Sequence, residues 1–140
     1  MTEFYTDALA ESRFLPELTD LTRSYWTGGL EGKLLLMRCD SCGTWVNPPE
    51  SPTCACGGTL APEESCGTGT VFTFSVNHHP YNPTVPNPYV IAIIEMDDQP
   101  NLRVFTNILG CEPEQVSIGM PVKVAFEDHG DKAVPVFIPR

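Results

Sequence analysis

Six cysteines are the residues of this 140-residue chain whose spacing most clearly indicates chemistry. Four of them form two close pairs, Cys39-x-x-Cys42 and Cys54-x-Cys56, with 11 residues between the pairs. Two such pairs on two turns can supply the four soft ligands that Zn²⁺ binds tetrahedrally at about 2.3 Å. Four protein ligands leave no open position for water, so this pattern predicts a structural zinc ion that does no chemistry itself.

Three other interpretations of the cysteines stay open, because the second pair is one residue shorter than the usual spacing. Disulfides are one, although the N-terminus lacks an apolar signal stretch, which favours a reducing compartment. A thioredoxin-like redox pair at Cys39 and Cys42 is another, although the surrounding βαβ pattern is missing. The third is a ribbon that has lost its metal. Cys66 is an alternative fourth ligand if Cys54 or Cys56 points away.

His78 and His79 are the other candidates for chemistry, as a base or as metal ligands. Adjacent residues on a strand point to opposite faces, so the two rings cannot readily bind one metal. No serine, cysteine or carboxylate stands nearby in a recognisable catalytic arrangement. The histidines are therefore weak catalytic candidates; no residue is assigned as catalytic, and cofactor-binding residues remain unknown.

The elements that position these residues are expected in three segments: a helical leader over residues 1–30, a zinc ribbon over 31–66 and a barrel over 67–140. Residues 2–27 are predicted to be helical, with a short first helix, a second that begins near Pro16 and a stop at Gly28-Gly29. The apolar face of the second helix would hold Leu15, Leu18, Leu21, Tyr25 and Trp26.

The ribbon and the barrel are predicted from strand patterns. Residues 34–37 enter the first cysteine turn as a strand, and a proline-rich return leads to the second turn, which is the plan of a rubredoxin-like zinc ribbon. Alternation beyond Gly67 places Phe72, Phe74 and Val76 on one face. Three strands, a helical turn and two more strands follow the order of a five-stranded OB-fold barrel, although a sandwich fragment fits the same pattern. The expected segments are 67–76, 89–96, 102–108, 112–116, 121–126 and 133–138.

Charge limits the classes of partner. Eight Lys and Arg against 18 Asp and Glu give a formal net charge of −10. No segment is basic, which argues against binding to nucleic acid or to an anionic membrane. The longest apolar run, Val90–Ile94, is far shorter than the roughly 20 residues of a membrane span. A cytoplasmic location is the default expectation.

Four aromatic residues are candidate interface anchors. Tyr25 and Trp26 lie on a leader with little core of its own, so the leader either packs on its own domain or docks on a partner. Tyr81 and Tyr89 flank the proline-rich segment 80–88, which is either an extended docking arm or a stiff connection between strands.

In their order and spacing, several short motifs of this chain resemble those of a prokaryotic family. These are the zinc-ribbon, OB-fold, acyl-CoA-associated proteins long filed as domain of unknown function 35. The shortened second cysteine pair and Cys66 depart from the family pattern. The motifs that carry the resemblance are Tyr25-Trp26, Gly32–Cys39-x-x-Cys42-Gly43, Gly67-x-Gly69-x-Val71-Phe72-x-Phe74, His79-Pro80, Pro88-Tyr89-Val90, Thr106-Asn107 and Gly119–Phe126.

The resemblance implies an accessory subunit of a thiolase-superfamily enzyme that acts on acyl-CoA. Family partners include thiolases, the sterol-carrier-type thiolases that act as aldolases in steroid side-chain degradation, and enoyl-CoA hydratases. The resemblance implies that the chain stabilises its partner and helps to form or channel the partner's acyl-CoA site. The site is expected to be shared, because this chain has few bases of its own to bind the phosphates of CoA. Two alternatives remain: a single-stranded nucleic-acid-binding OB-fold protein, and an autonomous acyl-CoA enzyme that uses His78 or His79.

Overall fold

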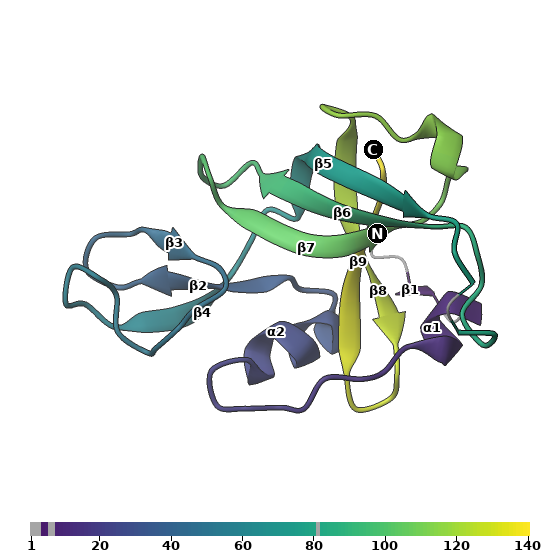
Figure 1. Cartoon of the computed structure of the whole chain (residues 1–140). Coiled ribbons are helices and arrows are strands. Elements are labelled where there is room, and N and C mark those ends of the chain that lie inside the picture. The colour runs from purple at the N-terminus through teal and green to yellow at the C-terminus, as the bar shows by residue number, and fades with distance from the viewer. Residues whose placement is uncertain (1–3, 6–7, 81) are drawn as a thin grey trace.

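Most of the regular structure in the described residues is β-strand, arranged in two sheets (Figure 1). A computed structural model describes residues 4–5, 8–80 and 82–140. The larger sheet has six strands and the smaller has three. The mainly β architecture predicted from the sequence, with a ribbon followed by a barrel, is confirmed.

Five strands beyond residue 67 close into a barrel. They are β5 (Thr68–Asn77), β6 (Tyr89–Met96), β7 (Arg103–Ile108), β8 (Pro121–Asp128) and β9 (Ala133–Pro139). β5 pairs with β6 and β8, β7 pairs with β6 and in parallel with β9, and the pairing of β8 with β9 completes the circle. With the short 3-10 helix η2 (Pro113–Gln115) between β7 and β8, this is the connectivity of an OB-fold.

Alternation along β6 shows how the sequence separates the inside of the barrel from the outside. Val90, Ala92, Ile94 and Met96 are buried, and the residues between them are half-buried on the outer face. This period of two is that of a pleated strand with one face in the core. The outward residues include two isoleucines, Ile91 and Ile93, which is unusual for the outer face of a sheet.

β5 departs from the predicted alternation at a β-bulge. Its register with β6 shifts between Val71 and Thr73. Because a bulge inserts one extra residue, the two faces exchange along the strand. Val71 is therefore buried and Phe74 packs against the core, whereas Phe72 is 42% exposed. The prediction that Phe72 shares a face with Phe74 was wrong.

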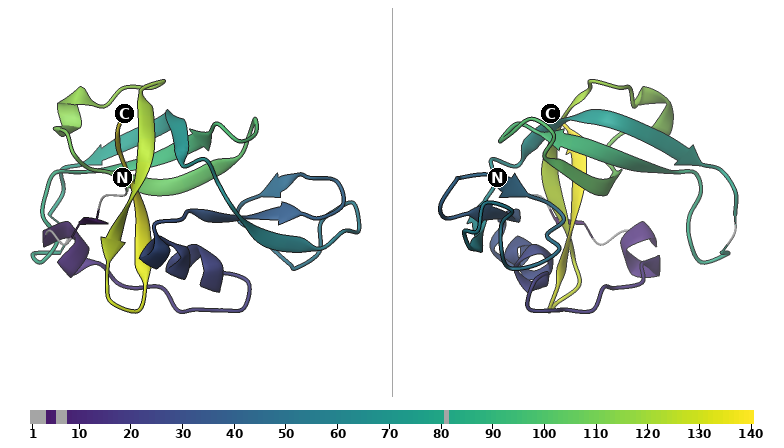
Figure 2. Two further views of the ribbon diagram at one scale, coloured as in Figure 1. Left: turned by 180° about the vertical axis from the view of Figure 1, so that it is seen from behind. Right: turned by 60° about the vertical axis from the view of Figure 1, so that its left-hand side comes forward.

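The ribbon is the three-stranded sheet, in which β2 (Leu35–Cys39) lies between β3 (Trp45–Val46) and β4 (Leu60–Glu64). It forms a lobe beside the barrel (Figure 2). Gln99, in the turn between β6 and β7, links the two: its Oε1 accepts the Trp45 backbone N–H at 2.9 Å, and its Nε2 donates to the Trp45 carbonyl at 3.1 Å. Leu34, Leu36 and Trp45 also belong to the main core cluster, so the lobe and the barrel share apolar packing.

The leader is less helical than the sequence predicted. It contains strand β1 (Phe4–Tyr5), which pairs in parallel with β8, and two helices of one turn each, α1 (Ala8–Ser12) and α2 (Arg23–Thr27). Residues 13–19 form no regular element. Pro16 disfavours helical geometry at Leu15, and the periodic apolar residues contact separate surfaces: Leu21 packs on the ribbon cluster, and Tyr25 packs on the main core.

The α-helix ends where the glycines were predicted to stop it: α2 ends at Thr27, and Gly28 is its C-cap residue. The helical path continues one turn further than predicted, as the 3-10 helix η1 (Gly28–Glu31), which is capped by Gly32 with a φ of 74°. Small residues are needed in η1, because a Cβ on Gly29 would lie 2.4 Å from the Phe126 ring and 2.7 Å from the Ala133 Cβ. The glycines therefore allow the leader to approach the barrel closely. No helix in the described part of the chain is long and apolar enough to cross a membrane.

Candidate metal centre and partner-facing surface

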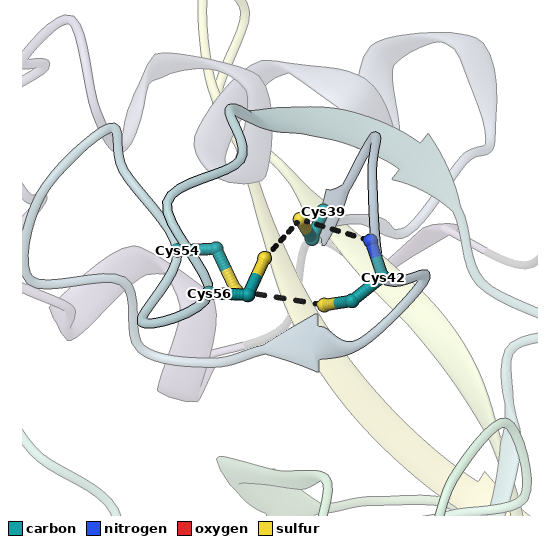
Figure 3. A group of neighbouring side chains, drawn as sticks. All are labelled: Cys39, Cys42, Cys54 and Cys56. Atoms are coloured by element: carbon teal, nitrogen blue, oxygen red, sulfur yellow. Dashed lines mark hydrogen bonds between the residues drawn. The ribbon is translucent and has the colours of Figure 1, made fainter.

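The fold brings the two cysteine pairs together at one end of the ribbon (Figure 3). Cys39 ends β2 and Cys42 follows in the turn after it, whereas Cys54 and Cys56 lie in the loop between β3 and β4. The four Sγ atoms lie within 4.8 Å of one another. The Cys39–Cys56 sulfurs are 3.4 Å apart, and the Cys42–Cys54 sulfurs are 3.7 Å apart.

Backbone and side-chain groups around the first pair favour thiolates. The amides of Cys42 and Ser41 each lie 3.4 Å from the Cys39 Sγ, and they lower the pKa of Cys39 below its ordinary value. The Thr44 hydroxyl lies 3.2 Å from the Cys42 Sγ. Together with the Thr44 backbone and the thiols of Cys56 and Cys39, it lowers the pKa of Cys42 to about 6. Amides that point at a metal-binding sulfur orient the ligand and disperse its charge.

In the second pair, the neighbouring thiols oppose the ionisation of Cys56. The Gly58 amide lowers the pKa of Cys56, but the three neighbouring thiols raise it to about 12. A divalent cation bound between the sulfurs would offset the repulsion between neighbouring thiolates and so favour the deprotonated thiols.

The donor set fits zinc. Four sulfurs at about 2.3 Å from one ion lie about 3.8 Å apart in a tetrahedron, which is close to the observed separations. Gly57, with φ 93°, makes the turn that lets the shortened pair reach the site. The predicted structural zinc is confirmed. Cys39, Cys42, Cys54 and Cys56 would hold the ion; as four protein ligands they would fill its coordination sphere, so it would stabilise the ribbon and leave no open position for a substrate.

The remaining cysteines lie elsewhere. The Cys66 Sγ is 3.4 Å from both the Thr68 Oγ1 and the Asp98 Oδ1, outside the group of four. Cys111 packs against the main core, and burial raises the pKa of its thiol. All six cysteines belong to the described residues, and none forms a disulfide.

Among the described residues, no side-chain hydrogen bond joins His78 or His79 to a carboxylate, serine or cysteine. His78 and His79 are exposed in the loop after β5. The backbone of His79 is held by the side chains of Asn77 and Asn87.

Three of the four predicted interface aromatics, Tyr25, Trp26 and Tyr89, line one cavity. The rings of Tyr25 and Trp26 meet edge to face at 4.6 Å, and burial raises the pKa of Tyr25 above its ordinary range. A cavity of about 400 Å³ has Tyr89 as well as these two residues in its wall. A second, of about 440 Å³, lies between α2, β2 and β7 and again includes Tyr25 and Trp26. Tyr81 lies outside the described residues.

Sequence reasoning missed a buried polar network that attaches the leader to the barrel. The Arg13 guanidinium donates to both carboxylate oxygens of Glu127, at 2.6 and 2.8 Å, and to the Asn107 Oδ1 at 2.7 Å. Glu127 is fully buried, and the His129 Nε2 lies 3.2 Å from its Oε1. No local pattern indicates a pair separated by 114 residues, and a charged residue near a strand end is ordinarily assigned to the surface.

Two family models match the chain in succession. The first, described as the ChsH2 rubredoxin-like zinc ribbon domain, matches residues 26–63. The second, described as the ChsH2 C-terminal OB-fold domain, matches residues 62–127. The two matches meet within β4, at the junction of the ribbon with the barrel.

Curated relatives fall into two groups. A probable enoyl-CoA hydratase alpha subunit of Thermomonospora curvata is 36% identical over 76% of this chain but 34% of its own length. The 3-oxo-4,17-pregnadiene-20-carboxyl-CoA hydratase alpha subunit of Mycobacterium tuberculosis is 40% identical over 48% of this chain and 21% of its own length. A DUF35 domain-containing scaffold protein of Methanocaldococcus jannaschii is 36% identical over 72% of this chain and 74% of its own length. The chain thus spans about a third or less of the hydratase subunits.

A solved structure matches the chain over nearly its whole length. It is described as the Ltp2-ChsH2(DUF35) aldolase, and the matched chain is 32% identical, with a TM-score of 0.77. The match covers 89% of this chain and 98% of the other.

Proposed function

Because this chain belongs to the DUF35 family of ChsH2-type zinc-ribbon and OB-fold proteins, we propose that it is a non-catalytic accessory subunit of a thiolase-superfamily enzyme that acts on acyl-CoA. The observation that carries the proposal is the match over 98% of a chain in an aldolase assembly that also contains Ltp2. The reaction would be thiolytic or retro-aldol cleavage, on a steroid or fatty acyl side chain.

The described residues support a role in assembly over a role in chemistry. The metal centre is closed by four cysteines, and the two adjacent histidines stand exposed in a loop. In the proposed division, residues 1–30 dock on the partner, 31–66 form the ribbon and 67–140 form the barrel. Tyr25, Trp26 and Tyr89 would contact the partner, as would Tyr81.

The acyl-CoA would be bound at a site shared with the partner. CoA carries several phosphate charges, and this chain has eight basic residues against 18 acidic ones. Charge-assisted hydrogen bonds from arginine or lysine are the usual means of binding phosphate. The partner would therefore supply most of the cations, while this chain shapes the channel that leads to the catalytic groups.

An enoyl-CoA hydratase is the second candidate partner, favoured by the two relatives that are hydratase alpha subunits. In each of them the matched region is a minor part of a longer chain. This chain would then correspond to the region of those subunits that holds the ribbon and the barrel.

Co-purification from the native host tests the proposal. The tagged chain should recover a thiolase-superfamily enzyme in stoichiometric amount, identified by mass spectrometry and retained through size exclusion. Recovery of a hydratase would favour the second candidate. A chain that elutes without a partner, or that binds single-stranded nucleic acid with a steep salt dependence, would contradict both.

A further inference from the structure

The outer face of β5, β6 and β7 is apolar where a solvent-facing sheet is ordinarily polar. Phe105 on β7 is 72% exposed and Phe72 in the β5 bulge is 42% exposed. Ile91 and Ile93, both half-buried, lie between them on β6. These four residues and Arg103 are called here the outer apolar face. Contiguous exposed apolar surface of this kind marks an interaction site.

Two hollows border this face. The cavities of about 400 and 440 Å³ both have Trp26 and Phe105 in their walls, so these two side chains form a ridge between them. The first also contains Ile91 and the second Ile93. Large side chains from another protein can fill such hollows while the ridge packs between them, the arrangement in which interface energy concentrates.

Arg103 brings an unpaired positive charge to the same face. Its guanidinium carbon lies 3.7 Å from the centre of the Phe72 ring, and its Nε is buried without a hydrogen-bond partner among the described residues. Glu95 stands opposite in the strand register, but its carboxylate accepts the Asn101 backbone N–H at 3.1 Å. The Arg103 Nη2 donates to the neutral Asn101 Oδ1 at 3.4 Å, but in the described part of the chain no carboxylate lies within 4.0 Å of the guanidinium.

We propose that the partner enzyme docks on the outer apolar face, with apolar side chains in the two hollows and a carboxylate on Arg103. This inference rests on the proposed function and names the surface that performs it. A guanidinium stacked on an aromatic ring can still donate Nη hydrogens to a carboxylate that approaches its edge. The partner surface is thus apolar at its centre, with one acidic residue placed to meet Arg103.

Charge favours a partner protein on the outer apolar face over a second copy of this chain and over CoA. A second copy of the chain would bring together two proteins of net charge −10, which repel each other. CoA would bring several phosphates to a face where, among the described residues, Arg103 is the only base. A partner protein that carries a carboxylate matches both the exposed aromatic surface and the Arg103 charge.

Binding of the co-purified partner enzyme to variants of the full chain tests the docking face. Phe105→Ser and Arg103→Glu should each weaken binding by about 30-fold or more, the loss expected at an interface hot spot. Arg103→Lys, which keeps the charge but loses the planar fork, should give a smaller loss. Ile118→Ser is the matched control, because Ile118 is also exposed, at 71%, but lies in the turn before β8. A photo-crosslinking residue at position 105 should link to the partner, and one at position 118 should not.

The outcomes separate the two proposals. If the wild-type chain binds its partner and all four variants bind equally well, the docking face is wrong and the proposed function stands. If the wild-type chain binds no thiolase-superfamily enzyme, both fail. Crosslinks from position 105 to a second copy, or acyl-CoA binding by the isolated chain that both Phe105→Ser and Arg103→Glu abolish, would assign the face to another occupant and overturn the inference.

Discussion

Glu127 is fully buried, so water does not solvate its carboxylate and the groups that contact it must compensate for the lost hydration. Arg13 supplies two hydrogen bonds and His129 lies beside it. A buried ion pair contributes little relative to apolar packing, but removal of one partner leaves an uncompensated charge in the interior. The Arg13–Glu127 pair therefore contributes little net free energy to folding. It still holds the leader on the barrel, because separating the two residues would leave the Glu127 charge buried and unpaired.

Arg13→Ala should lower the free energy of unfolding by about 3 kcal/mol, because it strands the buried carboxylate. Denaturant unfolding followed by circular dichroism measures the loss. The double variant Arg13→Met with Glu127→Gln should recover most of it, since it removes the charge together with its partner. Equal losses in the single and double variants would show that packing, and not charge, holds the leader in place.

The metal ligands make the second prediction at this scale. Cys39→Ser or Cys54→Ser should reduce the zinc content from one ion per chain to none, because each removes one of four thiolates. Elemental analysis of protein purified without added metal provides the measurement. Cys66→Ser is the control and should retain one zinc, since its sulfur lies outside the group of four. Loss of zinc from the Cys66→Ser variant would contradict the assignment of the four ligands to Cys39, Cys42, Cys54 and Cys56.

Among the elements, those whose sequence pattern is local and periodic could be predicted. The strand before the cysteines, the hairpin of β6 and β7, the turn η2 and the last two strands lie where alternation and turn residues place them. The leader differs because its apolar residues recur at helical spacing but pack on separate surfaces, Leu21 on the ribbon and Tyr25 on the main core. Spacing alone does not reveal those surfaces. The bulge in β5 is equally hidden, because one inserted residue changes which face Phe72 occupies without changing the sequence pattern.

Close approach of η1 to the barrel gives a prediction for this element. Gly29→Ala should destabilise the protein by about 2 kcal/mol, because the added Cβ would overlap the Phe126 ring and the Ala133 Cβ in a packed core. Thermal or denaturant unfolding measures the change. Leu30→Ala, at a 41% exposed position of the same helix, should cost much less. A tolerated Gly29→Ala would mean that the leader can shift away from the barrel.

Considered as a whole molecule, the chain combines a closed zinc site, a barrel with apolar residues on its outer face, and a large negative charge. The cysteine cluster could be predicted from sequence because its members are close along the chain and serve one metal. The outer apolar face could not, because Phe72, Ile93 and Phe105 come together only through strand pairing. Of these features, the outer apolar face is the one that we propose to serve assembly with another protein.

The most direct test of the accessory role is acyl-CoA turnover by the chain alone, by its co-purified partner alone and by the two reconstituted together. We expect no turnover by the chain, reduced turnover by the partner alone and full turnover by the mixture. The mixture should be unchanged when the chain carries His78→Ala and His79→Ala. Turnover by the isolated wild-type chain that this double variant abolishes would contradict the account.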